Sequence, residues 1–191
     1  MANASLTTAK KTITAKVYSV DLTPILYKLV NPEEGDGWTV EFAQEQVDLY
    51  RKFLILNAIY PNIQIVPTKD VDKVWHTHIL DTVKYFADTF YIFGTYFHHF
   101  PYFGLRGEQD ALDLQVAFEM SKLLFAEHFG CESSPSGGFA SDCGPTCSGG
   151  GCGGCADNVS SRIAKMTPES LLSKSNPVQG IYADNKARPR L

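Results

Sequence analysis

The chain lacks three features: cysteine before position 131, a long apolar run, and a strong charge of either sign. Without earlier cysteines, the folded body owes nothing to disulfides. A transmembrane helix needs about 20 apolar residues, and no apolar run approaches that length. The N-terminal stretch has no apolar segment typical of a secretory signal. The net charge of −4 argues against a general nucleic-acid binder. We therefore expect a soluble, cytoplasmic protein with no nucleic-acid or membrane partner.

Apolar residues are plentiful, and they recur at helical spacing. Hydrophobic residues make up 44% of the chain and aromatics 12%, enough for a packed core. The spacing predicts helices over residues 24–30, 40–60, 69–93 and 108–129. Short connections favour neighbouring helices, so the fold class is all-α, a small antiparallel helical bundle with a largely irregular C-terminal tail.

Polar and glycine residues mark the expected helix ends. Thr23 can cap the shortest helix, with Pro24 in its first turn. Thr39 can cap the next helix, and a long helix from residue 69 to 93 should end at Gly94. Thr68 or Asp70 can cap that long helix.

Composition divides the chain into four parts. Residues 1–20 form an N-terminal lead-in, either a short strand or a frayed segment. Residues 21–130 are the helical domain. Residues 131–155 are rich in Gly, Ser and Cys, and residues 156–191 carry six Lys or Arg against three Asp or Glu. The last two parts are expected to be a low-complexity segment and a basic tail.

Several motifs in order resemble one known family. They are "DLTPILYKLVNPEEGDGW", "YRKFLILNAIYP", "IVPTKDVDKVWHTHILDT", "YFADTFYIFG" and "HHFPYFGLRGEQD". Together they resemble the glycine-rich domain-containing protein-like family, which has bacterial and plant members, over residues 20–130. Its Gly-rich, often Cys-rich tail fits residues 131–155. The resemblance implies a domain identity and no particular reaction.

Four of the five histidines lie in "WHTHILDT" and "HHFPYFG". At 100° per residue, His76 and His78 point about 160° apart on one helix and cannot share a metal. Asp72 and His76 are four residues apart, and His78 and Asp81 are three apart. The helix thus presents two carboxylate–histidine pairs on opposite faces.

The aromatic loop after this helix should return over it and bring His98 or His99 close. With Asp72 and His76, a loop histidine would suit Zn²⁺ or Fe²⁺. The alternative is a structural role in which the histidines are hydrogen-bonded residues of the core or loop. Three apolar residues on the Asp72 side, Ile79, Val83 and Phe90, predict that this side is core, and Trp75 and Tyr102 are expected at an open rim.

The tail has four closely spaced thiols in the pattern C-x3-C-x4-C-x2-C, at Cys143, Cys147, Cys152 and Cys155. Glycines between them permit tight turns around one Zn²⁺ or a disulfide knot. Zinc sites usually leave a longer gap between two cysteine pairs, so a low-complexity segment with free thiols is the alternative.

Two functional hypotheses follow. In the first, a small helical protein of uncharacterised activity binds a transition metal, Zn or Fe, through the His/Asp cluster. In the second, a non-enzymatic interaction module contacts a protein partner through its aromatic loop and Cys/Gly tail. The sequence contains neither a phosphate-binding loop nor a nucleophile elbow that would assign a reaction.

Overall fold

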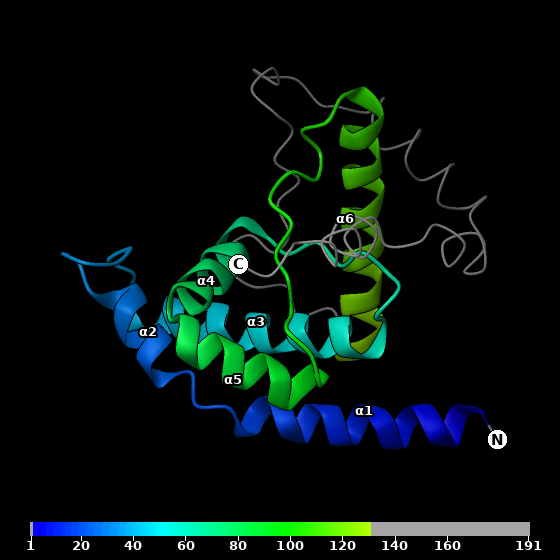
Figure 1. The fold of residues 1–191 in the computed structure, drawn as a ribbon, viewed down its shortest axis with the longest axis horizontal. Coiled ribbons are helices and arrows are strands. Elements are labelled where there is room, and N and C mark those ends of the chain that lie inside the picture. The colour runs from blue at the N-terminus through cyan, green and yellow to red at the C-terminus, as the bar shows by residue number, and fades with distance from the viewer. Residues whose placement is uncertain (1, 131–191) are drawn as a thin grey trace, which may run out of the picture. The chain divides into compact units, whose positions relative to one another are not determined.

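The computed structural model describes residues 2–130, with side chains from Thr8 onward. Within this range it has six helices and no strand (Figure 1): α1 (Ala2–Ser19), α2 (Thr23–Val30), α3 (Val40–Ile59), α4 (Lys69–Leu80), α5 (Thr82–Phe93) and α6 (Glu108–Phe129). The all-α prediction is confirmed. The Gly/Ser/Cys-rich segment and the basic tail lie outside the described residues. No helix in the described part is long and apolar enough to cross a membrane.

Most of the predicted caps are present. The Thr39 hydroxyl accepts the Phe42 N–H at 3.3 Å, and the Thr68 hydroxyl accepts the Val71 N–H at 3.2 Å. Gly94 ends α5 with φ of 75°, a left-handed conformation that glycine adopts without a steric penalty.

The cap predicted for α2 is wrong by one residue. Its N-cap is Leu22, which has no capping side chain, and Pro24 lies in the first turn as expected. The carboxylate of Asp21, two residues before Thr23, accepts the Thr23 N–H at 2.9 Å. It thereby satisfies one of the N–H groups that have no partner within the first turn of a helix.

Two segments differ from the expected elements. Residues 2–19 form a helix instead of a strand or a frayed segment. The helix expected over residues 69–93 is broken at Asp81, which has φ −81° and ψ 72°. The Asp81 carboxylate accepts the Lys84 N–H at 3.4 Å, so a residue type favoured at helix N-termini starts α5.

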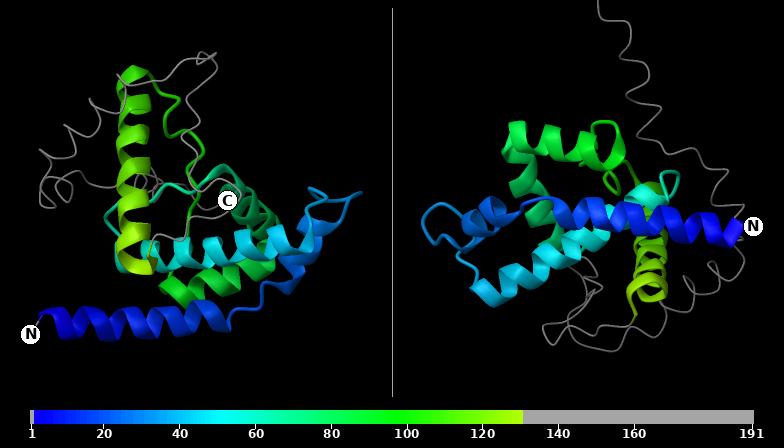
Figure 2. Two further views of the ribbon diagram at one scale, coloured as in Figure 1. Left: turned by 180° about the vertical axis from the view of Figure 1, so that it is seen from behind. Right: turned by 90° about the horizontal axis from the view of Figure 1, so that it is seen from below.

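The described residues fall into two compact units. The first comprises Met1–Pro61 and Pro67–Phe97, and contains α1 to α5. In it α3 packs against α1, α2 and α4, while α5 packs against α4 and α1. Figure 1 shows α1 and α3 running in opposite directions, and Figure 2 shows α1 along one side of this unit. Its fully buried large side chains include Leu22, Leu29, Tyr50, Phe53, Leu54, Ile55, Leu56, Val74 and Tyr85.

The second unit comprises, among the described residues, Asn62–Val66 and residues 98–130, including α6. The Val66 N–H donates to the Ser121 hydroxyl at 2.8 Å, which attaches the 62–66 segment to α6. Asp110, in the first turn of α6, accepts the N–H groups of Gly104 and Arg106 from the preceding loop at 2.6 and 3.1 Å. A hydrogen bond from the Arg106 side chain lowers the pKa of Asp110.

A side chain of α3 holds the C-terminal end of α1 in place. The part-buried Arg51 guanidinium donates to the carbonyl of Val17 at 2.6 Å and to that of Val20 at 2.9 Å. The Val17 carbonyl also accepts the Val20 N–H at 3.3 Å, so Arg51 supplies a second hydrogen bond there and one to the Val20 carbonyl just past the helix end. Tyr18 adds a bond from its hydroxyl to the Asp48 carboxylate at 2.8 Å.

Substituting Arg51→Met should lower the free energy of unfolding by about 1–3 kcal/mol, because it removes the Arg51 donor from the Val20 carbonyl and one of the two donors from the Val17 carbonyl while keeping apolar bulk. Urea denaturation followed by circular dichroism measures the change. Lys28→Met is the control, since the Lys28–Glu34 ion pair is largely exposed and should change stability by less than about 0.5 kcal/mol. Equal effects of the two substitutions would contradict the role assigned to Arg51.

Candidate functional site

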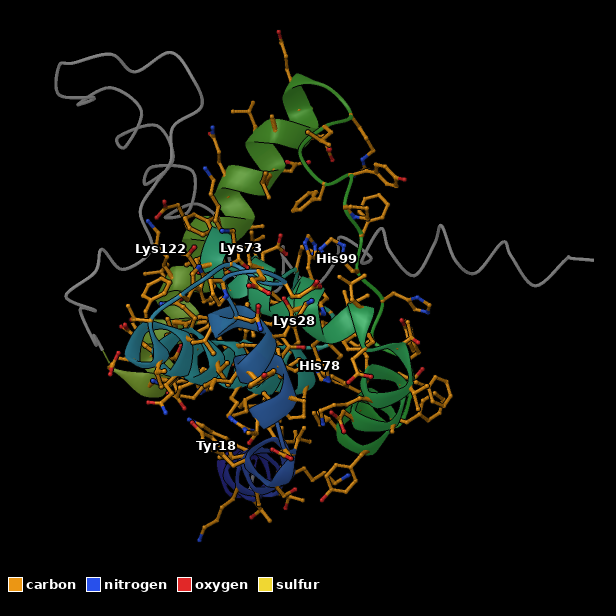
Figure 3. The ribbon with its side chains drawn as sticks, turned by 90° about the vertical axis from the view of Figure 1, so that its left-hand side faces the viewer. Tyr18, Lys28, Lys73, His78, His99 and Lys122 are labelled. Atoms are coloured by element: carbon orange, nitrogen blue, oxygen red, sulfur yellow. The ribbon has the colours of Figure 1, made fainter. Side chains whose placement is uncertain are left out.

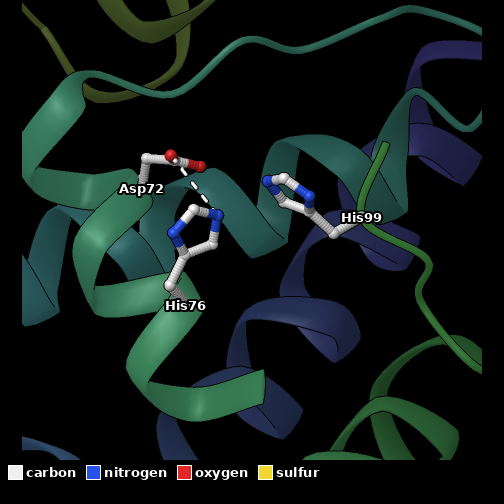
Figure 4. Close-up of side chains that lie close together, drawn as sticks. All are labelled: Asp72, His76 and His99. Atoms are coloured by element: carbon white, nitrogen blue, oxygen red, sulfur yellow. Dashed lines mark ion pairs between the residues drawn. The ribbon is translucent and has the colours of Figure 1, made fainter. Parts of the chain in front are cut away.

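Asp72 and His76 form an ion pair on the surface of α4, as their spacing predicts. The His76 Nε2 lies 3.5 Å from the Asp72 carboxylate, one helical turn away (Figure 4). The His76 side chain is 51% exposed and the Asp72 side chain 35%, so a dissolved ion can reach both. The helix therefore holds a carboxylate oxygen and an imidazole nitrogen at a spacing suited to chelation.

His78 lies on the buried side of α4 and is 1% exposed (Figure 3). Its Nε2 lies 3.0 Å from the Asp88 carboxylate on α5, and its Nδ1 lies 3.1 Å from the Tyr50 hydroxyl on α3. A carboxylate at Nε2 fixes the proton of the neutral ring there, so the Tyr50 hydroxyl donates to Nδ1. Both ring nitrogens thus have protein partners, and neither is left for a metal.

The structure pairs His78 with Asp88 instead of Asp81. Asp81 is exposed and caps α5, because the helix breaks at that residue. Sequence reasoning missed both Asp88 and Tyr50, which lie ten and twenty-eight residues from His78. Asp88 also accepts the Lys84 ammonium at 2.8 Å, so a cation balances its charge.

Tyr50, His78 and Asp88 have the order of a hydroxyl–imidazole–carboxylate catalytic triad, but their burial argues for a structural role. Tyr50 is 0% exposed, so no substrate reaches its hydroxyl. Burial raises the pKa of Tyr50 well above its usual value, whereas an activated nucleophile needs a lowered one. Burial also lowers the pKa of His78, with Asp88 opposing the shift, so the ring is mainly neutral at pH 7.

A second buried network holds the chain directly after α5. The Trp75 indole N–H donates to the Tyr85 hydroxyl at 2.8 Å, and that hydroxyl donates to the carbonyl of Phe97 at 2.5 Å. The Phe97 ring stacks on Trp75 with centroids 5.0 Å apart and on Phe93 at 4.7 Å. Phe97 therefore packs back onto α4, whereas the return expected of residues 98–103 stays a prediction.

The predicted assignment of core and surface is wrong at Trp75, Val83 and Phe90, whereas Tyr102 is exposed as expected. Trp75 is buried at 7% exposure, so it forms no open rim. Val83 and Phe90, predicted as core, are 82% and 45% exposed, and Tyr102 is 59% exposed. Within the described residues no buried side-chain nitrogen or oxygen lacks a hydrogen-bond partner, so the inner polar groups form a complete set.

His98 and His99 directly follow Phe97, in the second unit. His98 is exposed and His99 is half-buried. The fixed position of Phe97 limits His99, two residues on, to about 7 Å from that anchor. The tail cysteines, Cys143, Cys147, Cys152 and Cys155, lie outside the described residues, so their metal or disulfide role stays a prediction.

Part of the chain is similar to known proteins. Residues 23–88 match the model of a family described as glycine-rich domain-containing protein-like. The chain is also similar to Glycine-rich domain-containing protein 1 of Arabidopsis thaliana, with 34% identity over 93 residues. That stretch covers 47% of this chain and 11% of the relative, so the chain spans a small part of that protein's length. No solved structure matches the chain. The resemblance predicted from the motifs over residues 20–130 is confirmed for residues 23–88.

Replacing Tyr50 by Phe should lower the free energy of unfolding by about 1–3 kcal/mol, because the buried Nδ1 of His78 loses its donor while the aromatic ring stays. Chemical denaturation at pH 7 measures the loss. Tyr27→Phe, at a side chain 71% exposed, is the matched control and should change stability by less than about 0.5 kcal/mol. No loss in Tyr50→Phe would show that the hydrogen bond is unimportant.

Stability should fall as pH rises above about 10, the usual phenol pKa. Burial raises the pKa of Tyr50 and of Tyr85, so above that pH the unfolded chain releases these protons and the folded chain retains them. The unfolded state then binds fewer protons, and the free energy of unfolding decreases with pH. Denaturation between pH 9 and about 11 should show a shallower decline in Tyr50→Phe than in Tyr27→Phe. Equal slopes would contradict this assignment.

Proposed function

We propose that this glycine-rich domain-containing protein-like chain binds a divalent transition metal, Zn²⁺ or Fe²⁺, through Asp72, His76 and His99. The observation that carries the proposal is the exposed Asp72–His76 pair, 3.5 Å apart on adjacent turns of α4. One carboxylate and two imidazoles, each able to offer one ligand atom, are the nitrogen and oxygen donors that these metals accept.

The third ligand is argued from the chain that leads to it. Phe97 is held by its stacking on Trp75 and by the hydrogen bond from Tyr85 to its carbonyl. Trp75 directly precedes His76, so the anchor of the loop lies on the helix that carries the chelating pair. His99 follows by only two residues, a length of chain that allows its imidazole to reach that pair.

Such a ligand set has a chemical consequence. A metal with three protein ligands keeps at least one coordination position for water or a substrate, unlike a closed structural site. Asp72 would supply the negative charge, and His76 and His99 neutral nitrogen ligands.

A second candidate function is the non-enzymatic interaction module. It is favoured by the exposure of Tyr102 and Leu105, at 59% and 76%, in the loop before α6. Exposed large apolar side chains in a loop are common at protein-binding surfaces. In this case the Asp72–His76 pair would be an ordinary surface ion pair, which contributes little to stability.

Metal binding is tested on the full chain with its four clustered tail cysteines replaced by Ser, so that thiolates do not bind the metal. Titration with Zn²⁺, and with Co²⁺ as a coloured substitute, should show one equivalent bound without the absorption of thiolate ligands. His76→Ala and His99→Ala should each weaken binding by more than about 100-fold, since even neighbours of ligands contribute 10–100-fold.

His98→Ala is the matched control, because this exposed histidine adjoins His99 but is not in the proposed set. It should bind the metal as tightly as the parent chain. A parent chain that binds no Zn²⁺ or Fe²⁺, or that binds equally well after His76→Ala, would leave the interaction module as the better function. Circular dichroism should show unchanged folding in all variants, since His76 is half-exposed.

A further inference from the structure

The outer side of α5 has no charged side chain. Its exposed residues are Thr82, Val83, Phe86, Ala87, Phe90 and Tyr91. Exposure reaches 82% at Val83, 53% at Phe86 and 45% at Phe90, and Leu80 at the end of α4 is 81% exposed. A surface helix normally has a polar outer face, so this helix departs from the usual pattern.

The charged residues of α5 lie on another side of the helix. Lys84 and Asp88 are its only charged residues, and both are partly buried, where Asp88 bonds His78 and Lys84. The outer side is left with apolar and hydroxyl groups. An exposed apolar patch of this kind marks an interaction surface.

We propose that this face, the α5 stripe of Leu80, Val83, Phe86, Ala87 and Phe90, is a dimerisation surface that packs against the α5 stripe of a second copy of this chain. Phe86 and Phe90 are four residues apart and their ring centroids are 4.7 Å apart, so they form a ridge. Val83 and Ala87, also four apart, form a row of smaller side chains beside it. The Phe86–Phe90 ridge of one copy can pack against the row of Val83 and Ala87 in the other.

Charge also favours a second copy as the partner. In a two-fold symmetric contact, residues near the axis meet their own copies, so any charge there would oppose an identical charge. The α5 stripe has none. A partner with a charged binding face would find no opposite charge here and would have to lose its own hydration.

The available area predicts a transient dimer. Burying a whole aromatic side chain removes about 150–250 Å² from water, so the four large, partly exposed side chains of the stripe offer roughly 400 Å² in each copy. A stable interface buries about 800 Å² on each partner. Self-association is therefore expected only at high protein concentration.

The test is sedimentation velocity of the full chain in a reducing buffer, which prevents disulfide-linked dimers through the tail cysteines. Between about 10 µM and about 1 mM the wild type should shift from monomer to dimer, as a weak interface requires. Phe86→Glu should weaken self-association by about tenfold or more, because it opposes two like charges across the axis. Tyr27→Glu, at an exposed site on α2, is the matched control and should associate like the wild type.

Ala87→Glu guards against an effect of Phe86→Glu on folding, because its side chain is small and exposed. It should also weaken the dimer while circular dichroism stays unchanged. A wild type that remains monomeric at the highest concentration overturns the proposal, as does a dimer that persists in both variants. Hydrogen exchange of α5 that is the same at low and high concentration would also overturn it, because association through the stripe should slow exchange there.

Discussion

The buried imidazole of His78 joins three helices of the first unit. It lies on α4, receives a hydrogen bond from Tyr50 on α3, and donates one to Asp88 on α5. A buried ring nitrogen without a partner costs about 1–3 kcal/mol, so both neighbouring helices must be in register for the fold to be satisfied. Apolar contacts alone tolerate sliding, whereas these two bonds fix how α4 lies against α3 and α5.

The same network accounts for the unusual outer side of α5. This helix has two charged residues: Asp88 accepts a hydrogen bond from His78, and Lys84 pairs with Asp88 and balances its charge. Its aromatic residues then occupy the inner and the outer sides alike: Tyr85 is fully buried while Phe86 and Phe90 are half-exposed. Satisfying one buried histidine thus leaves an apolar surface facing outward, and the apolar face on α5 follows from the core beneath it.

Local features of the sequence predicted most of the helices, and long-range features caused the errors. Thr39, Thr68 and Gly94 mark helix ends by bonds within a few residues, which sequence reasoning can find. The break at Asp81 was missed because the apolar spacing continues through it. The break changes the phase between α4 and α5, so Val83 and Phe90 were assigned to the core side. The His78–Asp81 pair was wrong for the same reason, since it assumed an unbroken helix.

The proposed metal site likewise combines a pair that local spacing predicts with a residue whose place depends on tertiary structure. Asp72 and His76 are one turn apart on α4, so their pairing could be predicted from spacing alone. The place of His99 depends on Phe97, whose anchoring by Trp75 and Tyr85 is a tertiary feature. Residues 23–88, which match the family, contain the chelating pair but end before His99. Two ligands on one helix hold a metal weakly, so the proposed site needs a further donor, and His99 is the donor that we propose.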